Sequence, residues 1–211
     1  MRAVPMLTAT CLIMLALASC ANTIKGVGRD AANTVNATQN AGNRVGNAAA
    51  LPVDATQFDA AVSTQVIEYV SDVDAALLEI ARVLRPGGRA FILDTDFDSW
   101  VWYAADAERM ERIMKGWETH CADSRLPRTL IPRLRAVGFK IVGVEGYPLV
   151  NTTFRPGDFS YGLSQLIRDF LLERGFEHRV LDSWLADLLE VEQRNSSFFS
   201  LNRYFFSVEK P

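Results

Sequence analysis

The sequence predicts an α/β protein whose sheet is mainly parallel. Residues 58–63 form a short apolar run suited to a buried parallel strand, and residues 90–93 form a second one. Between them, Val73, Leu77, Ile80 and Leu84 recur at the spacing of one helix face. A strand, a helix, a turn and a strand at this spacing make a βαβ unit, which implies a right-handed crossover in a parallel sheet.

The ends of this helix are marked by residues that start and stop helices. Ser71 or Asp72 can cap its beginning, and Pro86-Gly87-Gly88 ends it. Apolar periodicity then predicts further elements along the chain. They are helices near residues 106–121 and 130–137, a strand at 140–147, a helix pair at 163–171 and 180–189, and a final strand at 198–208. The body is therefore expected to hold about four strands with flanking helices.

Composition excludes several classes of function. The chain has 211 residues, enough for one or two domains, and a net charge of −3, so it lacks the basic surface of a nucleic-acid-binding protein. Its two histidines, His120 and His178, are too few and too far apart for a metal cluster, and we expect His120 to lie on the surface. Three cysteines without a CxxC pair exclude a zinc ribbon and a disulfide framework.

Residues 1–20 have the pattern of an export signal. A basic start at Arg2 precedes an apolar run that is short for a transmembrane helix. The run ends in Leu17-Ala18-Ser19-Cys20, which resembles a bacterial lipobox. A lipobox implies a lipidated Cys20 and a membrane-anchored protein facing the periplasm. An uncleaved signal or a mistranslated start, with a cytoplasmic protein, is the alternative.

Residues 21–45 are predicted to be a flexible spacer. They are rich in Ala, Asn, Thr and Gly and contain no aromatic residue. Following Cys20, the stretches Ala21-Asn22-Thr23 and 26–30 (GVGRD) are similar to the entericidin family of small bacterial lipoproteins. A nucleotide-binding glycine loop at 26–28 is disfavoured, because no buried strand precedes it and its third glycine is missing.

Three short pieces follow one another in the body of the chain: 51–54 (LPVD), Phe58-Asp59, and 84–89 (LRPGGR). In this order they resemble the second half of a class I S-adenosylmethionine-dependent methyltransferase, and the resemblance covers residues 46–211. It implies a truncated Rossmann-like methyltransferase fold. Residues 58–63 would be the family's fourth strand, residues 90–94 its fifth, and the two later runs its last two strands.

The resemblance also implies a binding site for S-adenosylmethionine. Asn47 and Ala48 stand where the family contacts the adenine, and Ser63, Thr64 and Gln65 would face the methionine part. An ordinary strand-to-loop junction is the alternative for residues 63–65. The glycine loop and the ribose-binding acid of the family find no room before Leu51, so we expect weak cofactor binding or none.

Three acids, Asp94, Asp96 and Asp98, follow the predicted strand at 90–93. The carboxyl ends of parallel strands are where doubly wound folds bind ligands, so Asp96 is a candidate general base or substrate-orienting group. The alternative is that these acids cap a helix before Trp100.

Two functions from different classes remain open. One is methyl transfer to a small molecule, with the chain inactive if the lost half is essential. The other is an entericidin-like lipoprotein of the toxin/antidote type that carries a non-catalytic remnant. Loss of the family's first strand would also leave residues 58–63 as an exposed sheet edge, which predicts a homodimer or aggregation through that edge.

Overall fold

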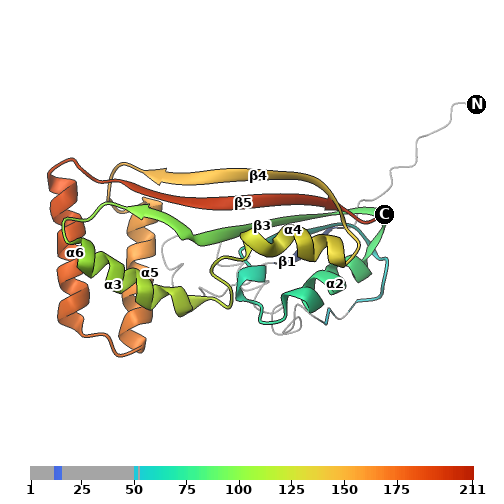
Figure 1. Cartoon of the computed structure of the whole chain (residues 1–211), viewed down its shortest axis with the longest axis horizontal. Coiled ribbons are helices and arrows are strands. Elements are labelled where there is room, and N and C mark those ends of the chain that lie inside the picture. Colours follow the sequence, from blue (N-terminus) through green and yellow to red (C-terminus); the bar gives the residue numbers. More distant parts are fainter. Residues whose placement is uncertain (1–11, 16–49, 52) are drawn as a thin grey trace, which may run out of the picture.

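The protein is an α/β fold built on one five-stranded sheet (Figure 1). The computed structural model describes residues 12–15, 50, 51 and 53–211. The sheet order is β1-β2-β3-β5-β4, with parallel pairing from β1 to β3 and antiparallel pairing from β3 to β4. The strands are β1 Leu12–Leu15, β2 Phe58–Thr64, β3 Leu84–Trp102, β4 Lys140–Asn151 and β5 Phe199–Glu209. The helices are η1 Ile67–Tyr69, α2 Val73–Val83, α3 Ala107–Trp117, η2 Glu118–His120, α4 Pro127–Ala136, α5 Phe159–Glu173 and α6 His178–Gln193. The predicted α/β class and the order of elements after residue 58 are confirmed. The prediction of a mainly parallel sheet is wrong, because β5 pairs antiparallel with both β3 and β4 and makes the sheet mixed.

The predicted edge at residues 58–63 is wrong. Strand β1 pairs in parallel with β2, from Leu12 beside Ala60 to Leu15 beside Ser63. The apolar run containing Leu12–Leu15 was interpreted as an export signal, but a buried parallel strand has the same apolar composition. Among the described residues, the free edges of the sheet are therefore β1 and β4.

The βαβ unit forms as its sequence predicts. The Asp72 side chain accepts a hydrogen bond from the Ala75 backbone N–H (3.0 Å) and caps the start of α2. At the other end of α2, the ammonium of Lys210 donates to the carbonyls of Ala81 (2.7 Å) and Leu84 (2.8 Å). Gly87 adopts a left-handed backbone (φ 77°), and the register between β2 and β3 shifts at this point. The turn at residues 86–88 is thus an irregularity at the start of β3.

Strand β3 is much longer than the apolar run at residues 90–93. It continues to Trp102 because β5 lies beside it over most of its length, from Arg89 opposite Glu209 to Trp102 opposite Phe199. Asp94, Asp96 and Asp98 therefore lie within the strand. The helix cap expected before Trp100 is wrong, since the next helix is α3, whose N-cap is Asp106.

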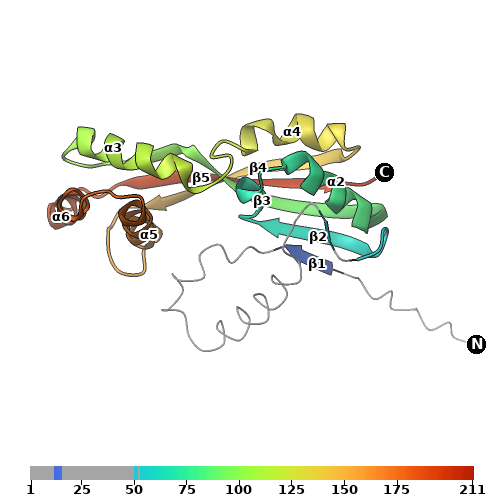
Figure 2. The ribbon, with the colours of Figure 1, turned by 90° about the horizontal axis from the view of Figure 1, so that it is seen from below.

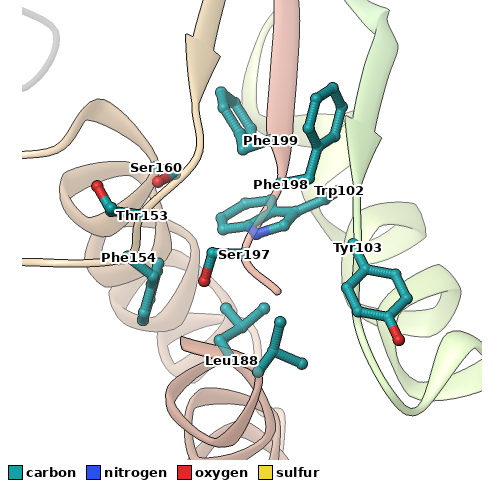
Figure 3. Close-up of a pocket in the computed structure, with 10 residues that line it drawn as sticks. Trp102, Tyr103, Thr153, Phe154, Ser160, Leu188, Ser197, Phe198 and Phe199 are labelled. Carbon is teal, nitrogen blue, oxygen red and sulfur yellow. The ribbon is translucent and has the colours of Figure 1, made fainter. Parts of the chain in front are cut away.

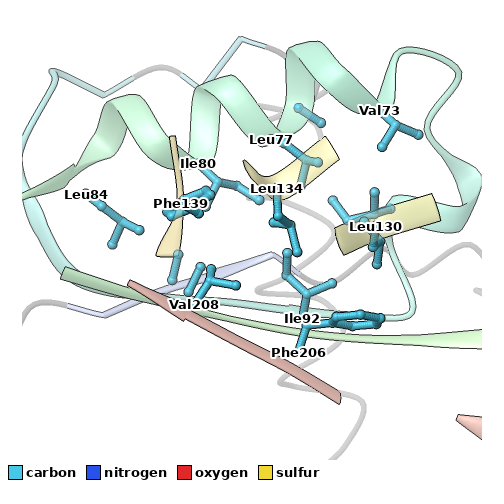
Figure 4. Close-up of a cluster of buried hydrophobic side chains, with 14 of the residues drawn as sticks. Val73, Leu77, Ile80, Leu84, Ile92, Leu130, Leu134, Phe139, Phe206 and Val208 are labelled. Carbon is cyan, nitrogen blue, oxygen red and sulfur yellow. The ribbon is translucent and has the colours of Figure 1, made fainter. Parts of the chain in front are cut away.

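Two hydrophobic clusters lie at opposite ends of the sheet. The first packs α2 and α4 against the strands, with Leu77, Leu130 and Phe206 fully buried at its centre (Figure 4). The second joins α3, α5 and α6 to the far ends of β3 and β5, around Trp102 and Trp184. Figure 2 shows α2 and α4 together at one end of the sheet and α3, α5 and α6 at the other. The carboxyl ends of β2 and of the part of β3 that pairs with it lie between the two clusters.

Candidate functional site

The carboxyl ends of β2 and β3 meet at a small group of polar side chains. Ser63 is 2% exposed, and its hydroxyl has no hydrogen-bond partner among the described residues. Thr64, the next residue, is exposed because successive strand side chains point to opposite faces. Gln65 turns the chain with a left-handed backbone (φ 55°), and its amide Nε2 donates to the hydroxyl of Thr95 on β3. The structure therefore brings Ser63 and Gln65 to the strand ends but separates Thr64 from Ser63.

Two buried carboxyl groups lie beside these residues. Glu68, in η1, is 0% exposed, and its Oε2 accepts a hydrogen bond from the Thr95 backbone N–H (2.8 Å). Asp94, on β3, is also 0% exposed, and its Oδ1 accepts from the Val66 backbone N–H (3.2 Å). Glu68 Oε1 and Asp94 Oδ2 have no partner in the described structure. Ser63 lies beside Ile92, two residues before Asp94, so its side chain is on the same face of the sheet as that of Asp94.

Burial changes the protonation of this pair. It raises the pKa of Glu68 to about 7, although the Thr95 hydrogen bond and the Arg203 guanidinium act in the opposite direction. Burial and the nearby Glu68 also raise the pKa of Asp94 well above its ordinary value. The two acids therefore hold protons at pH values where exposed carboxyl groups are ionised. A pair of this kind can donate as well as accept hydrogen bonds, and it favours a cationic ligand once ionised.

His120 lies next to this group and is not the surface residue expected from the sequence. Its ring stacks on Trp117 with centroids 3.8 Å apart and meets the edge of Phe97 at 4.3 Å. Its Nδ1 lies 2.7 Å from the Trp117 carbonyl oxygen, which can only accept, so Nδ1 carries the proton and Nε2 is a bare acceptor. Burial lowers the pKa of His120 to about 4, so the ring is neutral near pH 7.

Asp96, the candidate base, is held in an ion pair. Both of its oxygens bind Arg128 of α4, Oδ2 at 2.8 Å from Nε and Oδ1 at 3.1 Å from a terminal nitrogen. Arg128 also reaches Asp98 (2.9 Å), and Oδ1 of Asp96 accepts from the Asp98 backbone N–H (3.1 Å). This bidentate geometry uses the lone pairs that a general base would need. The contacts favour a positioning role in which Asp96 fixes α4 against β3.

The remaining predicted site residues, Asn47, Ala48 and Cys20, lie outside the described residues. The adenine contacts and the lipidation site accordingly stay predictions. Sequence reasoning missed Glu68 and Arg203, which converge on the site from η1 and β5. A glutamate at the fourth position after a buried strand was the one available signal for Glu68.

Two hollows in the surface lie away from the strand ends. A crevice between α5, α6 and the far ends of β3 to β5 is lined by aromatic side chains such as Trp102, Phe154 and Phe199 (Figure 3). It is too narrow to admit a water molecule. An open groove of about 410 Å³ lies between α3 and α6. Within residues 12–15, 50, 51 and 53–211, no group of three or more His, Cys, Asp or Glu side chains is arranged to hold a metal ion. None of the helices in this part of the chain is long and apolar enough to cross a membrane.

Comparison with known proteins relates the front of the chain to methyltransferases. Residues 8–92 match the family described as a methyltransferase domain. The chain is 41% identical over 69 residues to the ubiquinone/menaquinone biosynthesis C-methyltransferase UbiE of Allorhizobium ampelinum, a match covering 33% of this chain. It is 32% identical over 89 residues, 42% of the chain, to an uncharacterized 37.1 kDa protein in transposon TN4556 of Streptomyces fradiae. These matches span 27% and 25% of the two relatives' own lengths.

Solved structures show more distant similarity. A protein of Bacillus halodurans C-125 described as a methyltransferase has 12% identity and a TM-score of 0.49, covering 78% of this chain and 75% of its own. The [4+2]-cyclase SpnF has 22% identity and a TM-score of 0.41, covering 82% and 60%. The family match is the more informative result. It begins at residue 8, before β1, and ends within β3, so it includes Ser63, Gln65 and Glu68.

Proposed function

We propose that this chain, whose residues 8–92 match the methyltransferase domain family, carries an S-adenosylmethionine site and transfers methyl groups to a small molecule. The observation that carries the proposal is the buried polar group at the carboxyl ends of β2 and β3. Ser63, Gln65 and Glu68 of this group fall inside the matched segment, which ends two residues before Asp94. The group lies at the edge of the sheet where doubly wound folds bind their ligands.

The chemistry of this group fits the cofactor. S-adenosylmethionine carries a positive sulfonium and an ammonium, which seek acceptors and negative charge. Glu68 Oε1, Asp94 Oδ2 and the Ser63 hydroxyl are buried and lack hydrogen-bond partners in the described structure, so their hydrogen-bonding capacity is unused. A buried polar atom without a partner costs about 1–3 kcal/mol, and a ligand that supplies a hydrogen bond recovers part of it.

The cofactor supplies an activated methyl group, and the residues of this chain position the reactants. Ser63 and the two carboxyl groups hold the cationic end of the ligand, and Gln65 fixes the turn that opens the site through its bond to Thr95. Methyl transfer depends mostly on holding the reactants in line, so the rigidity of this turn is its main contribution. The related C-methyltransferase supports a small-molecule acceptor for this chain.

The lipoprotein alternative receives less support. Leu12–Leu15 lies inside the expected leader, yet it forms β1 and pairs with β2. The methyltransferase match also runs through most of residues 1–45. Lipidation of Cys20 and the periplasmic location remain predictions, which fatty-acid labelling of the chain and of Cys20→Ser would test.

Ligand-observed NMR with S-adenosylmethionine tests the proposed site on the full chain. Two or three hydrogen bonds of ~1 kcal/mol each predict weak binding, with a Kd on the order of 10 mM. Ser63→Ala should weaken binding several-fold because it removes a buried hydroxyl at the site. Thr64→Ala is the matched control, since Thr64 is exposed on the opposite face. Absence of saturation transfer at millimolar ligand, or equal effects of the two substitutions, would contradict the proposal.

A further inference from the structure

Strand β4 is an exposed edge of the sheet with an unusually apolar surface. It pairs with β5 on one side, and Figure 1 shows no helix or strand of the described chain beyond it. Four of the nine large apolar side chains that are exposed in the described structure belong to β4. They are Val142 (50% exposed), Val144 (41%), Tyr147 (48%) and Val150 (52%). Exposed apolar edges of this length recruit other strands.

Pro148 reveals which backbone groups face the open side. It lies opposite Asn202 of β5, and the Asn202 backbone N–H donates to the hydroxyl of Ser99 on β3 (2.9 Å). Asn202 therefore directs its hydrogen-bonding groups away from β4, and Pro148 directs its own away from β5. The register is regular from Gly143 to Asn151, so every second residue shares this orientation. Val144, Gly146 and Val150 thus present both N–H and C=O to the open edge, and Pro148 presents its C=O alone.

We propose that β4 pairs antiparallel with β4 of a second copy of this chain, about a two-fold axis at Tyr147. In this register, Val144 lies opposite Val150 of the partner subunit, and the reciprocal pair forms across the axis. Gly146 lies opposite Pro148 of the partner subunit, on the same face of the sheet as the valine pairs. Tyr147 lies opposite the partner's Tyr147, on the opposite face of the sheet. The two sheets become one, and each face gains an apolar contact of the kind that stabilises strand pairs.

Neighbouring registers are less favourable. Hydrogen-bonded pairs require an outward-facing residue on both strands, so the axis moves only in whole-residue steps along β4. An axis at Glu145 would place two carboxylates opposite each other, and an axis at Pro148 would place two residues without N–H groups at the centre. An axis at Gly146 would put Val144 against proline and lose both valine pairs. The axis at Tyr147 also leaves Glu145, the only charged residue from 144 to 151, opposite leucine.

The area of this contact predicts a reversible dimer. Stable interfaces bury about 800 Å² on each partner, which one short strand does not supply by itself. We therefore expect a monomer–dimer equilibrium in the micromolar range. Analytical ultracentrifugation of the full chain should show a mass that rises with concentration and levels off at the dimer.

Val144→Lys should weaken this dimer at least about tenfold, because the two-fold axis makes each substitution act twice. Leu78→Lys is the matched control: Leu78 is 55% exposed on α2, far from the edge, and its replacement should leave the equilibrium unchanged. A wild-type monomer at all concentrations, growth beyond the dimer, or equal effects of the two substitutions would overturn the proposal.

A cysteine scan locates the axis independently of the affinity. Non-hydrogen-bonded antiparallel pairs have Cα atoms about 4.5 Å apart, within disulfide range. Under mild oxidation, Tyr147→Cys should form a linked dimer in greater yield than wild type. Val150→Cys should not exceed wild type, because it faces Val144 of the partner subunit. Circular dichroism checks that each variant is folded. Stronger cross-linking through a cysteine at residue 150 than through one at residue 147 would refute this register.

Discussion

Replacing Glu68 by glutamine should remove a pH-dependent loss of stability. Glu68 is fully buried, and burial raises its pKa from 4.5 to about 7. Between these values the folded chain keeps the proton and the unfolded chain releases it. Because the unfolded state then binds fewer protons, the free energy of unfolding falls as pH rises. Glutamine is neutral at every pH and keeps an oxygen that can accept from the Thr95 N–H.

The size of the effect follows from the two pKa values. Each pH unit between 4.5 and 7 costs ~1.4 kcal/mol, so the wild type loses about 3 kcal/mol across this window. The full contribution of Glu68 is present below pH 4.5 and is gone above pH 7. The variant should therefore gain about 3 kcal/mol relative to the wild type when both are taken from pH 4.5 to pH 8.

Urea unfolding at pH 4.5, 6, 7 and 8 measures this difference. Comparing variant with wild type at each pH cancels the titration of groups that do not interact with Glu68. His120, whose effect has the opposite sign, is one of them, whereas Asp94 is not, because Glu68 contributes to its raised pKa. Glu111→Gln is the matched control, because Glu111 is exposed on α3 and its replacement should leave the curve parallel to wild type. Parallel curves for Glu68→Gln and wild type would show that Glu68 is ionised in the fold, contrary to the reasoning.

Three further predictions test the contacts around the site and the turn. His120→Gln should gain stability relative to the wild type as pH falls from 6.5 to 4. The buried ring of His120 stays unprotonated in the fold while the unfolded chain takes up the proton, and the variant lacks this cost. An NMR titration of the imidazole in the wild type checks the same point. Arg128→Ala should lower the midpoint of thermal unfolding, since the buried carboxylate of Asp96 would lose its ion pair although Arg128 itself is 47% exposed. Arg135→Ala on the same helix should leave the midpoint nearly unchanged. Gly88→Ala should lower the free energy of unfolding by ~2 kcal/mol, because the new Cβ would lie 2.8 Å from the Arg85 carbonyl oxygen. Gly162→Ala should instead stabilise α5 by ~0.5–1 kcal/mol, because its Cβ would meet no atom within 4 Å.

Local periodicity was sufficient to predict most of the fold. The helix after Asp72 and the strand beginning at Phe58 were predicted because their signals lie in adjacent residues: a cap, a 3.6-residue repeat and a short apolar run. The pairing of Leu12–Leu15 with β2 was missed because hydrophobicity alone does not distinguish an export signal from a buried strand. The long extension of β3 to Trp102 was missed because β5, more than 100 residues away along the chain, supplies its ladder.

For the site residues too, local sequence signals were sufficient for some predictions, while contacts between distant residues were missed. Ser63 and Gln65 were predicted from their place at the end of a strand. Asp96 was assigned a chemical role because its partner, Arg128, lies 32 residues away and is brought close only by the packing of α4. His120 was assigned to the surface because Phe97 and Trp117 enclose it through tertiary contacts that no helical pattern shows.

Strands β3 and β5 are shared by both hydrophobic clusters, and this sharing determines how cooperatively the protein unfolds. Both hydrophobic clusters are anchored on β3 and β5, whose ladder runs unbroken through the sheet except for one register shift after Asp96. Unfolding of either cluster would expose part of β3 and β5, on which the other cluster also packs. The free energies of unfolding of the two clusters are therefore coupled. We expect the described domain to unfold as one cooperative unit although it has two hydrophobic clusters. Within the β3–β5 ladder, backbone amides near the register shift should lose their protection from hydrogen exchange first.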